Sequence, residues 1–353
     1  MKHKRIVLIL ILAVLFLVHG NSLSLGWTAN LSSSKQGETS FFEIHFIDVG
    51  QGDCALILCD GKAMLIDGGE ASQSSKVYAY LKEHGVDHLN YIVASHAHAD
   101  HVGGLSGALN YATVDVALCP VLDYDTKTFQ SFVKYLGQQN VSITIPNAGD
   151  TFELGSATIQ ILAPFRDYED PNDTSIVMKV VYGETSFLFT GDATRIAEAD
   201  ILDAGYDLSA TVLKVGHHGS DTSTSYPFLR EIMPKYAIIS VGKDNTYGHP
   251  TDNTLSRLRD ADVAVLRTDL LGTIICTSDG EEVTFETEKR PLNIQRYRTG
   301  LLVSECSAYI TANKKDVFPN PRLRSIWRVL RKASCILFRL VDHAVLAVGF
   351  SVV

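Results

Sequence analysis

The sequence predicts a mixed α/β (α+β) fold of four layers, in which two β-sheets lie face to face and helices cover both outer faces (αββα). Between Phe41 and Thr287 the chain carries many short apolar runs of strand length, broken by Gly, Asp and Asn. So many apolar strands cannot share one small flat sheet. Helical segments lie among them, so two sheets with outer helices is the arrangement that hides every apolar face.

The expected strands are short and follow one another first as meanders and then in alternation with helices. They span residues 41–49, 54–59, 62–67, 91–95, 114–120, 157–164, 175–182, 186–192, 210–216, 236–242, 262–268, 272–278 and 281–287. Each is rich in β-branched and aromatic residues and is bounded by turn-forming residues.

Four segments have helical periodicity with recognisable ends. Those at 74–85, 129–140 and 196–205 contain a glycine near their ends (Gly85, Gly137 and Gly205), which is typical of a helix stop. The fourth, at 251–261, begins with Thr251 and Asp252, either of which can cap a helix.

The N-terminus is typical of an exported protein. Basic residues precede an uncharged apolar run from Ile6 to Val18, which is shorter than the roughly 18 to 20 residues that span a bilayer. We therefore expect residues 1–24 to be a signal peptide or an uncleaved anchor, and the polar stretch 25–40 to be a linker. The protein would then be secreted or extracytoplasmic.

Composition and charge divide the rest of the chain into two parts. With 46% hydrophobic and 20% charged residues, the composition is that of a globular protein and excludes general disorder. From Lys289 onward there are 12 Lys and Arg against 3 Asp and Glu, net +9. Met1 to Glu288 contains the other 19 Lys and Arg residues and 37 Asp and Glu residues, a net charge of −18. We expect one folded domain at 41–288 and a basic, apolar extension of unknown role at 289–353, which could contact a membrane surface.

One stretch carries most of the chemistry. The sequence ASHAHADHVGG, from Ala94 to Gly104, places His96, His98, Asp100 and His101 within six residues after an apolar run. Imidazoles and carboxylates are costly to bury unpaired, so packing does not explain them. On extended backbone His96 and His98 project to one side and can hold one cation, while Asp100 and His101 would face a second.

HAHADH resembles the signature of the metallo-beta-lactamase superfamily, whose members use the αββα sandwich and commonly bind two metals. Further motifs resemble the branch that contains ComEC-type competence proteins. They are FIDVGQGDCALI (46–57), LIDGG (65–69), NDTSIV (172–177), FLFTGDA (187–193), LKVGHHGSDTSTS (213–225), SVGKDNTYGHP (240–250) and LRTDLLGTI (266–274). The resemblance covers roughly 42–285 and implies two divalent cations, zinc or alternatively manganese.

The resemblance also implies distant ligands. Asp192 takes the place of the carboxylate shared by both metals, and His217 or His218 that of the final histidine ligand. We expect His217 to be the ligand, because the preceding strand points there first, and His218 to support it. Many members have another histidine between HxHxDH and the aspartate, but here none occurs between His101 and His217. Water or substrate would then complete the first site.

The remaining motifs are assigned to the substrate. Asn172, Ser175, Ser220 and His249 are candidates for substrate binding, and His249 with Asp100 for catalysis. The alternative is turn capping for Asn172 and Ser175 and a surface turn for His249. Asp48, Asp53 and Asp67 are expected to be scaffold beneath the metals and not ligands.

A cation pair lowers the pKa of a shared water toward about 7, so a metal-bound hydroxide would be the nucleophile. The motifs favour an exported phosphodiesterase or nuclease acting on a phosphodiester, with DNA implied by the family. The acidic body argues against a polyanion. A phosphocholine-type esterase of the cell envelope and a noncatalytic surface-binding module therefore stay as alternatives.

Overall fold

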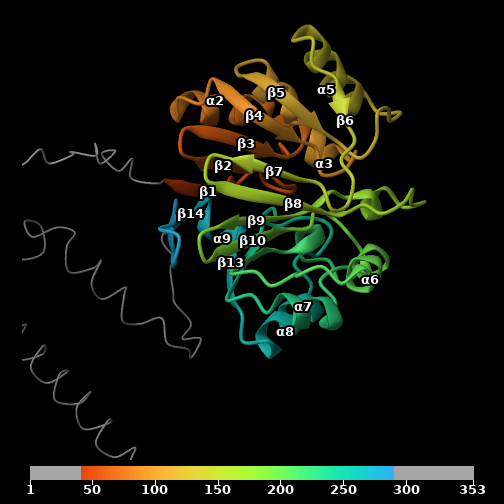
Figure 1. Cartoon of the computed structure of the whole chain (residues 1–353), viewed down its shortest axis with the longest axis vertical. Coiled ribbons are helices and arrows are strands. Elements are labelled where there is room, and N and C mark those ends of the chain that lie inside the picture. Colours follow the sequence, from red (N-terminus) through yellow and green to blue (C-terminus); the bar gives the residue numbers. More distant parts are fainter. Residues whose placement is uncertain (1–40, 290–353) are drawn as a thin grey trace, which may run out of the picture. The chain divides into compact units, whose positions relative to one another are not determined.

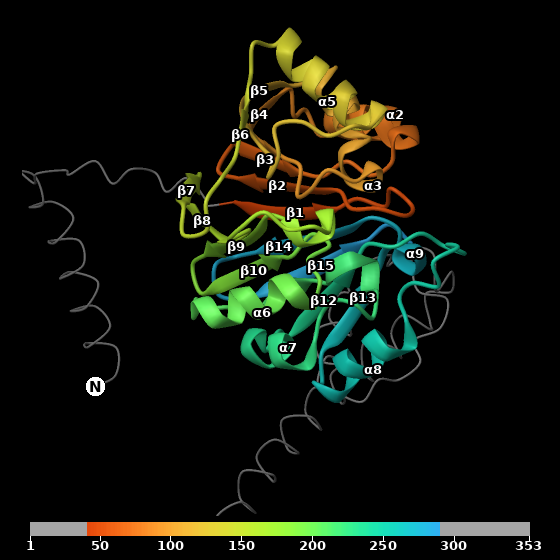
Figure 2. The ribbon, with the colours of Figure 1, turned by 90° about the vertical axis from the view of Figure 1, so that its right-hand side faces the viewer.

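In the computed structural model of the protein, residues 41–289 are described. They form two β-sheets packed face to face, with helices on both outer faces (Figure 1, Figure 2). The fold class predicted from the sequence is confirmed. The predicted signal segment or anchor (1–24), the linker (25–40) and residues 290–353 of the basic extension lie outside the described residues.

The first sheet has eight strands in the order β15-β14-β1-β2-β3-β4-β5-β6. Pairing is antiparallel from β15 to β3 and parallel from β3 to β6. The strands are β1 (Phe42–Phe46), β2 (Ala55–Cys59), β3 (Lys62–Ile66), β4 (His88–Val93), β5 (Thr113–Leu118), β6 (Ile143–Thr144), β14 (Ile274–Ser278) and β15 (Val283–Thr287).

The second sheet has seven strands in the order β13-β12-β11-β10-β9-β8-β7. It is parallel from β10 to β13 and antiparallel elsewhere. The strands are β7 (Thr151–Leu154), β8 (Ala157–Ala163), β9 (Val177–Tyr182), β10 (Thr185–Phe189), β11 (Val212–Lys214), β12 (Tyr236–Ile239) and β13 (Ala264–Arg267).

Helices complete the four layers. Those packed on the first sheet are α2 (Ser74–Glu83), α3 (Ala99–Val102), α4 (Leu105–Leu109) and α5 (Lys127–Gln138). Those on the second are α6 (Arg195–Ala204), α7 (Tyr226–Ile232) and α8 (Asp252–Asp260). The short elements are α9 (Thr268–Leu271) and the 3₁₀ turns η1 (Ala71–Gln73), η2 (Pro171–Thr174) and η3 (Gly216–Gly219).

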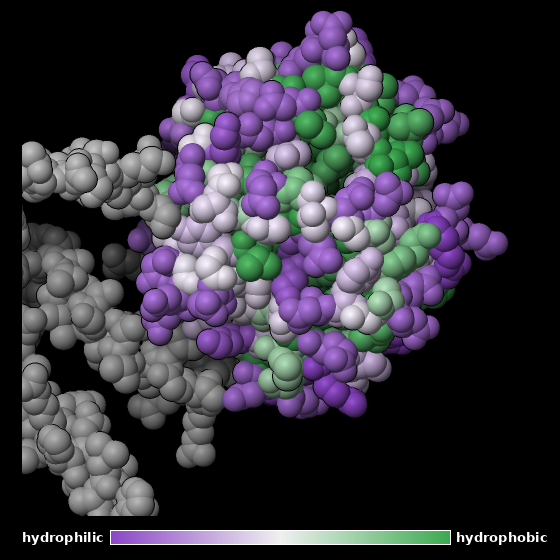
Figure 3. Space-filling view, viewed as in Figure 1, coloured by the Kyte–Doolittle hydropathy of each residue, from purple (hydrophilic) through white to green (hydrophobic). Residues whose placement is uncertain are grey.

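Three apolar layers hold the sandwich together. The layer between the sheets contains Phe42 and Phe187, whose rings stack at 5.1 Å. A second layer, with Phe129 and Phe132, joins the first sheet to its helices, and a third, with Phe228, does the same for the second sheet. On the face seen in Figure 1, the apolar residues left at the surface form patches among hydrophilic ones (Figure 3).

The predicted strands and the four predicted helices are all present, but short elements were missed. Strands β6 and β7 lie at sheet edges and are too short to show a clear alternation. Helices α3 and α4 have four and five residues, less than two turns. Within residues 41–289, no helix is both long enough and apolar enough to cross a membrane.

Candidate metal centre

The predicted ligands meet where parallel strands of both sheets end. His96 and His98 lie in the loop after β4, and Asp100 and His101 belong to α3. From the second sheet, Asp192 follows β10 and the His217-His218 pair follows β11. In open α/β sheets, ligands bind outside the carboxyl ends of strands, so this is a favourable place for a site.

Glycines allow the two loops of the first sheet to approach closely. A Cβ on Gly104 would collide with the carbonyl of Gly68, and one on Gly103 with the backbone of Ala71 and Ala99. The backbone amide of Gly68 donates to the His101 carbonyl at 2.7 Å. The two glycines after the histidine cluster therefore allow α3 to pack directly against the LIDGG loop.

Four residues form what we call the inner group: Asp100, His101, Asp192 and His218. Each offers one ligand atom, and these atoms all lie within 4.8 Å of one another. Asp192 Oδ2 lies 3.2 Å from His101 Nε2 and 3.6 Å from His218 Nε2. Asp100 Oδ2 lies 3.2 Å from His218 Nε2. Two carboxylates and two imidazoles are a ligand set suited to zinc and related cations.

The outer group consists of His96, His98 and His217 on the other side of Asp192. His96 Nε2 lies 3.1 Å from His98 Nδ1 and 4.0 Å from Asp192 Oδ2. His217 Nε2 lies 3.7 Å from the same carboxylate oxygen. Asp192 is therefore the one carboxylate within 4 Å of imidazoles from both groups among residues 41–289.

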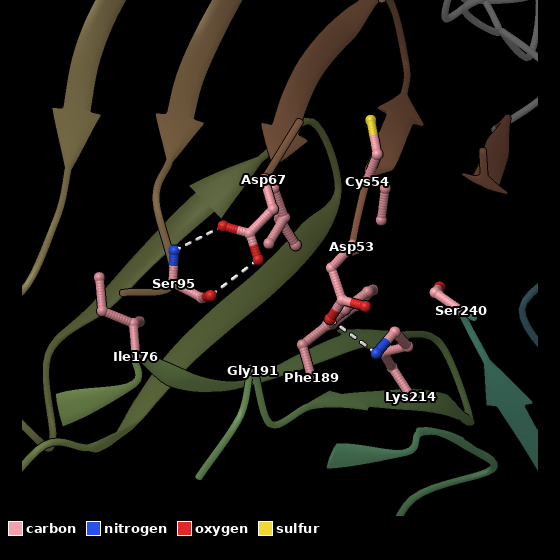
Figure 4. Close-up of a pocket in the computed structure, with 11 residues that line it drawn as sticks. Asp53, Cys54, Asp67, Ser95, Ile176, Phe189, Gly191, Lys214 and Ser240 are labelled. Atoms are coloured by element: carbon pink, nitrogen blue, oxygen red, sulfur yellow. Dashed lines mark hydrogen bonds and ion pairs between the residues drawn. The ribbon is translucent and has the colours of Figure 1, made fainter. Parts of the chain in front are cut away.

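His101 is held by a buried carboxylate. Its Nδ1 lies 2.9 Å from Asp67 Oδ2. Asp67 also accepts hydrogen bonds from the backbone amide and the hydroxyl of Ser95, both at 2.7 Å (Figure 4). Since Nδ1 is occupied, Nε2 is left to face Asp192. Asp67 thus holds His101 from the side away from Asp192, and with Asp53 and His101 it also forms a second group whose ligand atoms lie within 4.8 Å of one another.

His218 is held from behind in a similar way. Its Nδ1 lies 3.0 Å from the carbonyl oxygen of Ser240 and 3.1 Å from Asp53 Oδ1. Asp53 in turn forms an ion pair with Lys214 at 2.7 Å (Figure 4). Like Asp67, Asp53 lies beneath the ligand atoms as scaffold.

The electrostatic field of the inner group attracts positive charge. Burial alone would lower the pKa of His218, but the carboxylates of Asp192 and Asp53 outweigh it and raise that pKa to about 10. The same balance, with Asp192 and Asp67, raises the pKa of His101 well above its usual value. A proton and a metal cation compete for these nitrogens, so a field that favours one also favours the other.

Buried atoms without partners support a fit to cations. Among the described residues, His101 Nε2 and Asp192 Oδ1 are buried and make no hydrogen bond. An unpaired polar atom in the interior is costly unless something absent from the chain itself binds it. Both atoms belong to the inner group, so its residues fit a metal ion.

The structure places His218, and not the preferred His217, in the inner group. His218 is buried and its Nε2 belongs to the inner group, whereas His217 is 24% exposed and its Nδ1 lies 3.2 Å from the Thr222 hydroxyl. The argument from strand direction fails because the strand ends at Lys214, and both histidines take left-handed backbone angles (φ 50° and 52°). Such strain is typical of functional sites.

Two residues predicted to bind substrate have other positions. Ser175 is fully buried, and its Oγ accepts from the Asp192 amide at 3.0 Å, so it supports Asp192 and cannot meet a substrate at the surface. Ser220 is also buried, and its Oγ lies 3.0 Å from the Thr222 hydroxyl within its own turn. Ser220 therefore stabilises its own turn, whereas Ser175 links the start of β9 to the loop after β10.

The other two candidates are more open. The ring of His249 lies 5.7 Å from that of His217 and stacks on Tyr247, which is 66% exposed. Burial, and then the neighbouring His217, lower the pKa of His249. Asn172 is half-buried in η2, and its Oδ1 is without a partner among the described residues.

Sequence reasoning missed Lys214 and Ser95. Lys214 is the one charged residue of the buried strand β11, and a buried lysine is rare unless it is paired. A lysine within an otherwise apolar strand was therefore a signal that the sequence already contained. Ser95 gave none, because a serine at the end of a strand is ordinary until its contact with Asp67 is known.

Comparison with known proteins agrees with this geometry. The family model described as "Metallo-beta-lactamase superfamily" matches residues 47–243, more than half of the chain. The chain belongs to the metallo-beta-lactamase superfamily. It is a hydrolase of that superfamily with a candidate metal site, and the branch is the ComEC-type one, as relatives among competence proteins show.

Three such relatives are each 30% identical to the chain. They are ComE operon protein 3 of Bacillus subtilis (66% of this chain, 32% of that protein), Competence protein ComA of Neisseria gonorrhoeae (64% and 31%) and Recombination protein 2 of Haemophilus influenzae (75% and 31%). The chain thus spans about a third of the length of the curated relatives it matches.

Among solved structures, the metallo-beta-lactamase fold protein YhfI from Bacillus subtilis is similar, with 15% identity and a TM-score of 0.47. The similarity covers 67% of this chain and all of that one.

Proposed function

We propose that the protein is a metal-dependent phosphodiesterase whose substrate is a nucleic acid, that is, a nuclease. The observation that carries the proposal is the inner group, in which two carboxylates and two imidazoles from four places in the sequence bring ligand atoms within 4.8 Å. We propose zinc as the metal, with manganese as the alternative, because both accept imidazole and carboxylate ligands.

The two groups would divide the cations between them. Asp100, His101 and His218 would hold one and His96, His98 and His217 the other, with Asp192 shared. When bound, a pair of cations activates a water molecule and stabilises charge on phosphoryl oxygens. His217 would take the place of the histidine that the chain lacks between His101 and itself.

Residues at the rim would act on the substrate. His249 is within reach of the outer group, and its lowered pKa leaves it neutral near pH 7, able to donate a hydrogen bond to a phosphate or leaving oxygen. Asn172 would offer its amide group to the same substrate. Asp100, 24% exposed, would remain ionised as a ligand and orient the attacking water.

Aromatic rings at the rim support a nucleic-acid substrate. The exposed Tyr247 stacks on His249, and the ring of Tyr124 lies 6.4 Å from that of His98. The two tyrosines follow strands of different sheets, β12 and β5. An exposed aromatic ring such as that of Tyr247 is the usual platform on which unpaired bases stack, whereas Tyr124 is half-buried and offers only part of its ring.

DNA is the nucleic acid we propose first, because the relatives are named for competence and recombination. The same relatives support an extracytoplasmic or membrane-associated place of action. Export through residues 1–24 and contact with a membrane surface through residues 1–24 or 289–353 are parts of this proposal.

Net charge favours a second candidate. Met1 to Glu288 carries −18, and such a body repels a polyanion. A phosphocholine ester of the cell envelope bears less charge, and its quaternary ammonium group could contact the ring of Tyr247. The protein would then be an esterase with the same metal centre.

A substrate panel tests the proposal. Purified protein is assayed with single-stranded DNA, duplex DNA and a phosphocholine ester, with added zinc or manganese and with a chelator. The proposal expects chelator-sensitive cleavage of DNA, fastest on single strands. Cleavage of the choline ester alone would establish the second candidate. Binding of DNA without cleavage, unchanged by the chelator, would show a noncatalytic binding module.

A further inference from the structure

Two charged residues behind the candidate metal centre are buried as a pair. Asp53 and Lys214 are 5% and 3% exposed, and their side chains meet at 2.7 Å in the space between the sheets (Figure 4). Stability alone does not account for such a pair, because an apolar pair of similar size usually stabilises a core as well or better. The position of the pair points to another role.

The pair lies directly behind His218. Asp53 Oδ1 is 3.1 Å from His218 Nδ1, while His218 Nε2 points the other way, 3.2 Å from Asp100 Oδ2. The backbone amide of Asp53 also donates to the carbonyl of Asp100 at 3.2 Å. Asp53 therefore contacts two members of the inner group, one through its side chain and one through its backbone.

We propose that Lys214 and Asp53 are positioning residues, which orient His218 so that Nε2 binds the inner cation; the inference rests on the metal centre of the proposed function. A negative charge beside Nδ1–H, together with the Ser240 carbonyl, fixes the tautomer with a free Nε2 and makes that nitrogen more basic. Lys214 contacts the other oxygen of the Asp53 carboxylate at 2.7 Å and so keeps Oδ1 facing Nδ1.

Comparison with Asp67 explains why a lysine is needed. Asp67, behind His101, accepts two hydrogen bonds from Ser95, which stabilise its charge. Asp53 has no such serine within hydrogen-bond distance among the described residues, and its Oδ1 accepts no well-aligned hydrogen bond. Lys214, 2.7 Å from Asp53 Oδ2, is therefore the side chain that holds this carboxylate in place.

The test measures metal affinity and requires no activity. Zinc affinity is determined by chelator competition for the full chain, for Lys214→Met and for Lys179→Met. Lys179 is a matched control, because it is also a buried lysine of the second sheet, paired with Asp207 at 2.8 Å, but Asp207 contacts no candidate ligand. We expect one of two zinc ions to bind about 10- to 100-fold more weakly in Lys214→Met, and no change in Lys179→Met.

A double variant keeps the test decisive if Lys214→Met does not fold. Asp53→Leu with Lys214→Met removes both charges and leaves no unpaired one, so it should fold. One zinc ion should still bind about 10- to 100-fold more weakly, and the visible spectrum of the cobalt-loaded protein should change for that ion only.

Wild-type affinity and an unchanged cobalt spectrum in the folded double variant would overturn the inference, as would a wild-type chain that binds no zinc. Two tight zinc ions, one of them weakened in the variants, with no cleavage of any phosphodiester, would support the inference while refuting the proposed function.

Discussion

The inner and outer groups of the candidate centre differ in how their side chains are held. In the inner group, His101 and His218 each have Nδ1 beside a buried carboxylate, Asp67 or Asp53. In the outer group, His98 is half-buried and contacts His96. His217 Nδ1 lies beside the Thr222 hydroxyl and not beside a carboxylate.

The pKa values of the histidines also differ between the two groups. Burial, with a further contribution from His101, lowers the pKa of His96, whereas nearby carboxylates raise the pKa of His101 and His218. The inner group is therefore arranged for a cation before one arrives. The outer group needs adjustment on binding, which costs affinity, and we expect its cation to bind more weakly.

The largest effect is expected from removing what the two groups share. Asp192→Ala should weaken metal binding at the inner and the outer group alike, because it removes the ligand that both groups share. We expect loss of both tightly bound metals and a fall in activity of roughly 10³-fold or more, since a cation contributes several kcal/mol to transition-state stabilisation. Metal content and initial rates measure this, with the exposed Asp260→Ala as control. Retention of one metal would show that Asp192 is not shared.

Substituting the adjacent histidines separately should sharpen the comparison. His218→Ala should remove the tighter metal and reduce activity by about 10²-fold or more, whereas His217→Ala should weaken only the second metal, with a fall of about tenfold. Stepwise zinc titration of both variants measures the difference. The opposite order would restore the original preference for His217.

The scaffold of the inner group gives a smaller effect. Asp67→Asn should weaken one metal by about 10- to 100-fold, because an amide cannot accept from both Ser95 and His101. The matched control is Asp115→Asn, whose carboxylate pairs with the exposed His88 at 3.0 Å on the same sheet. Equal changes in both variants would mean that the effect is not specific to the centre.

The smallest effect is expected from substituting Tyr247, at the rim beside the outer group. Tyr247→Ala should raise KM for single-stranded DNA about fivefold, through loss of roughly 1 kcal/mol of stacking, with kcat nearly unchanged. Tyr247→Phe retains the ring and should behave like the wild type. If the two variants are equally impaired, the hydroxyl and not the ring is what matters.

The sequence predicted the ligands of the HAHADH motif better than it predicted what holds them in place. His96, His98, Asp100 and His101 are neighbours in the chain, so their spacing is visible, as is the glycine pair that follows. The layers also follow from local patterns, because strand alternation and helix periodicity reflect burial on one face. These parts of the structure are determined by residues that lie close together in the sequence, so the sequence alone predicts them.

What the sequence did not reveal depends on contacts between distant segments. The choice between His217 and His218 turns on left-handed backbone angles after β11, which no propensity predicts. Ser175 was predicted to bind substrate as part of the NDTSIV motif, yet it supports Asp192, which is 17 residues away. Lys214 could have been noticed as a charge in an apolar strand, but only the fold shows that its partner is Asp53.

Anomalous diffraction from crystals of the zinc-loaded protein tests the central claim most directly. We predict two zinc peaks on either side of Asp192, with the stronger peak among Asp100, His101 and His218 and the weaker beside His96 and His98. Peaks remote from Asp192, or a single peak bound by His96 and His98 with His218 left free, would contradict the account.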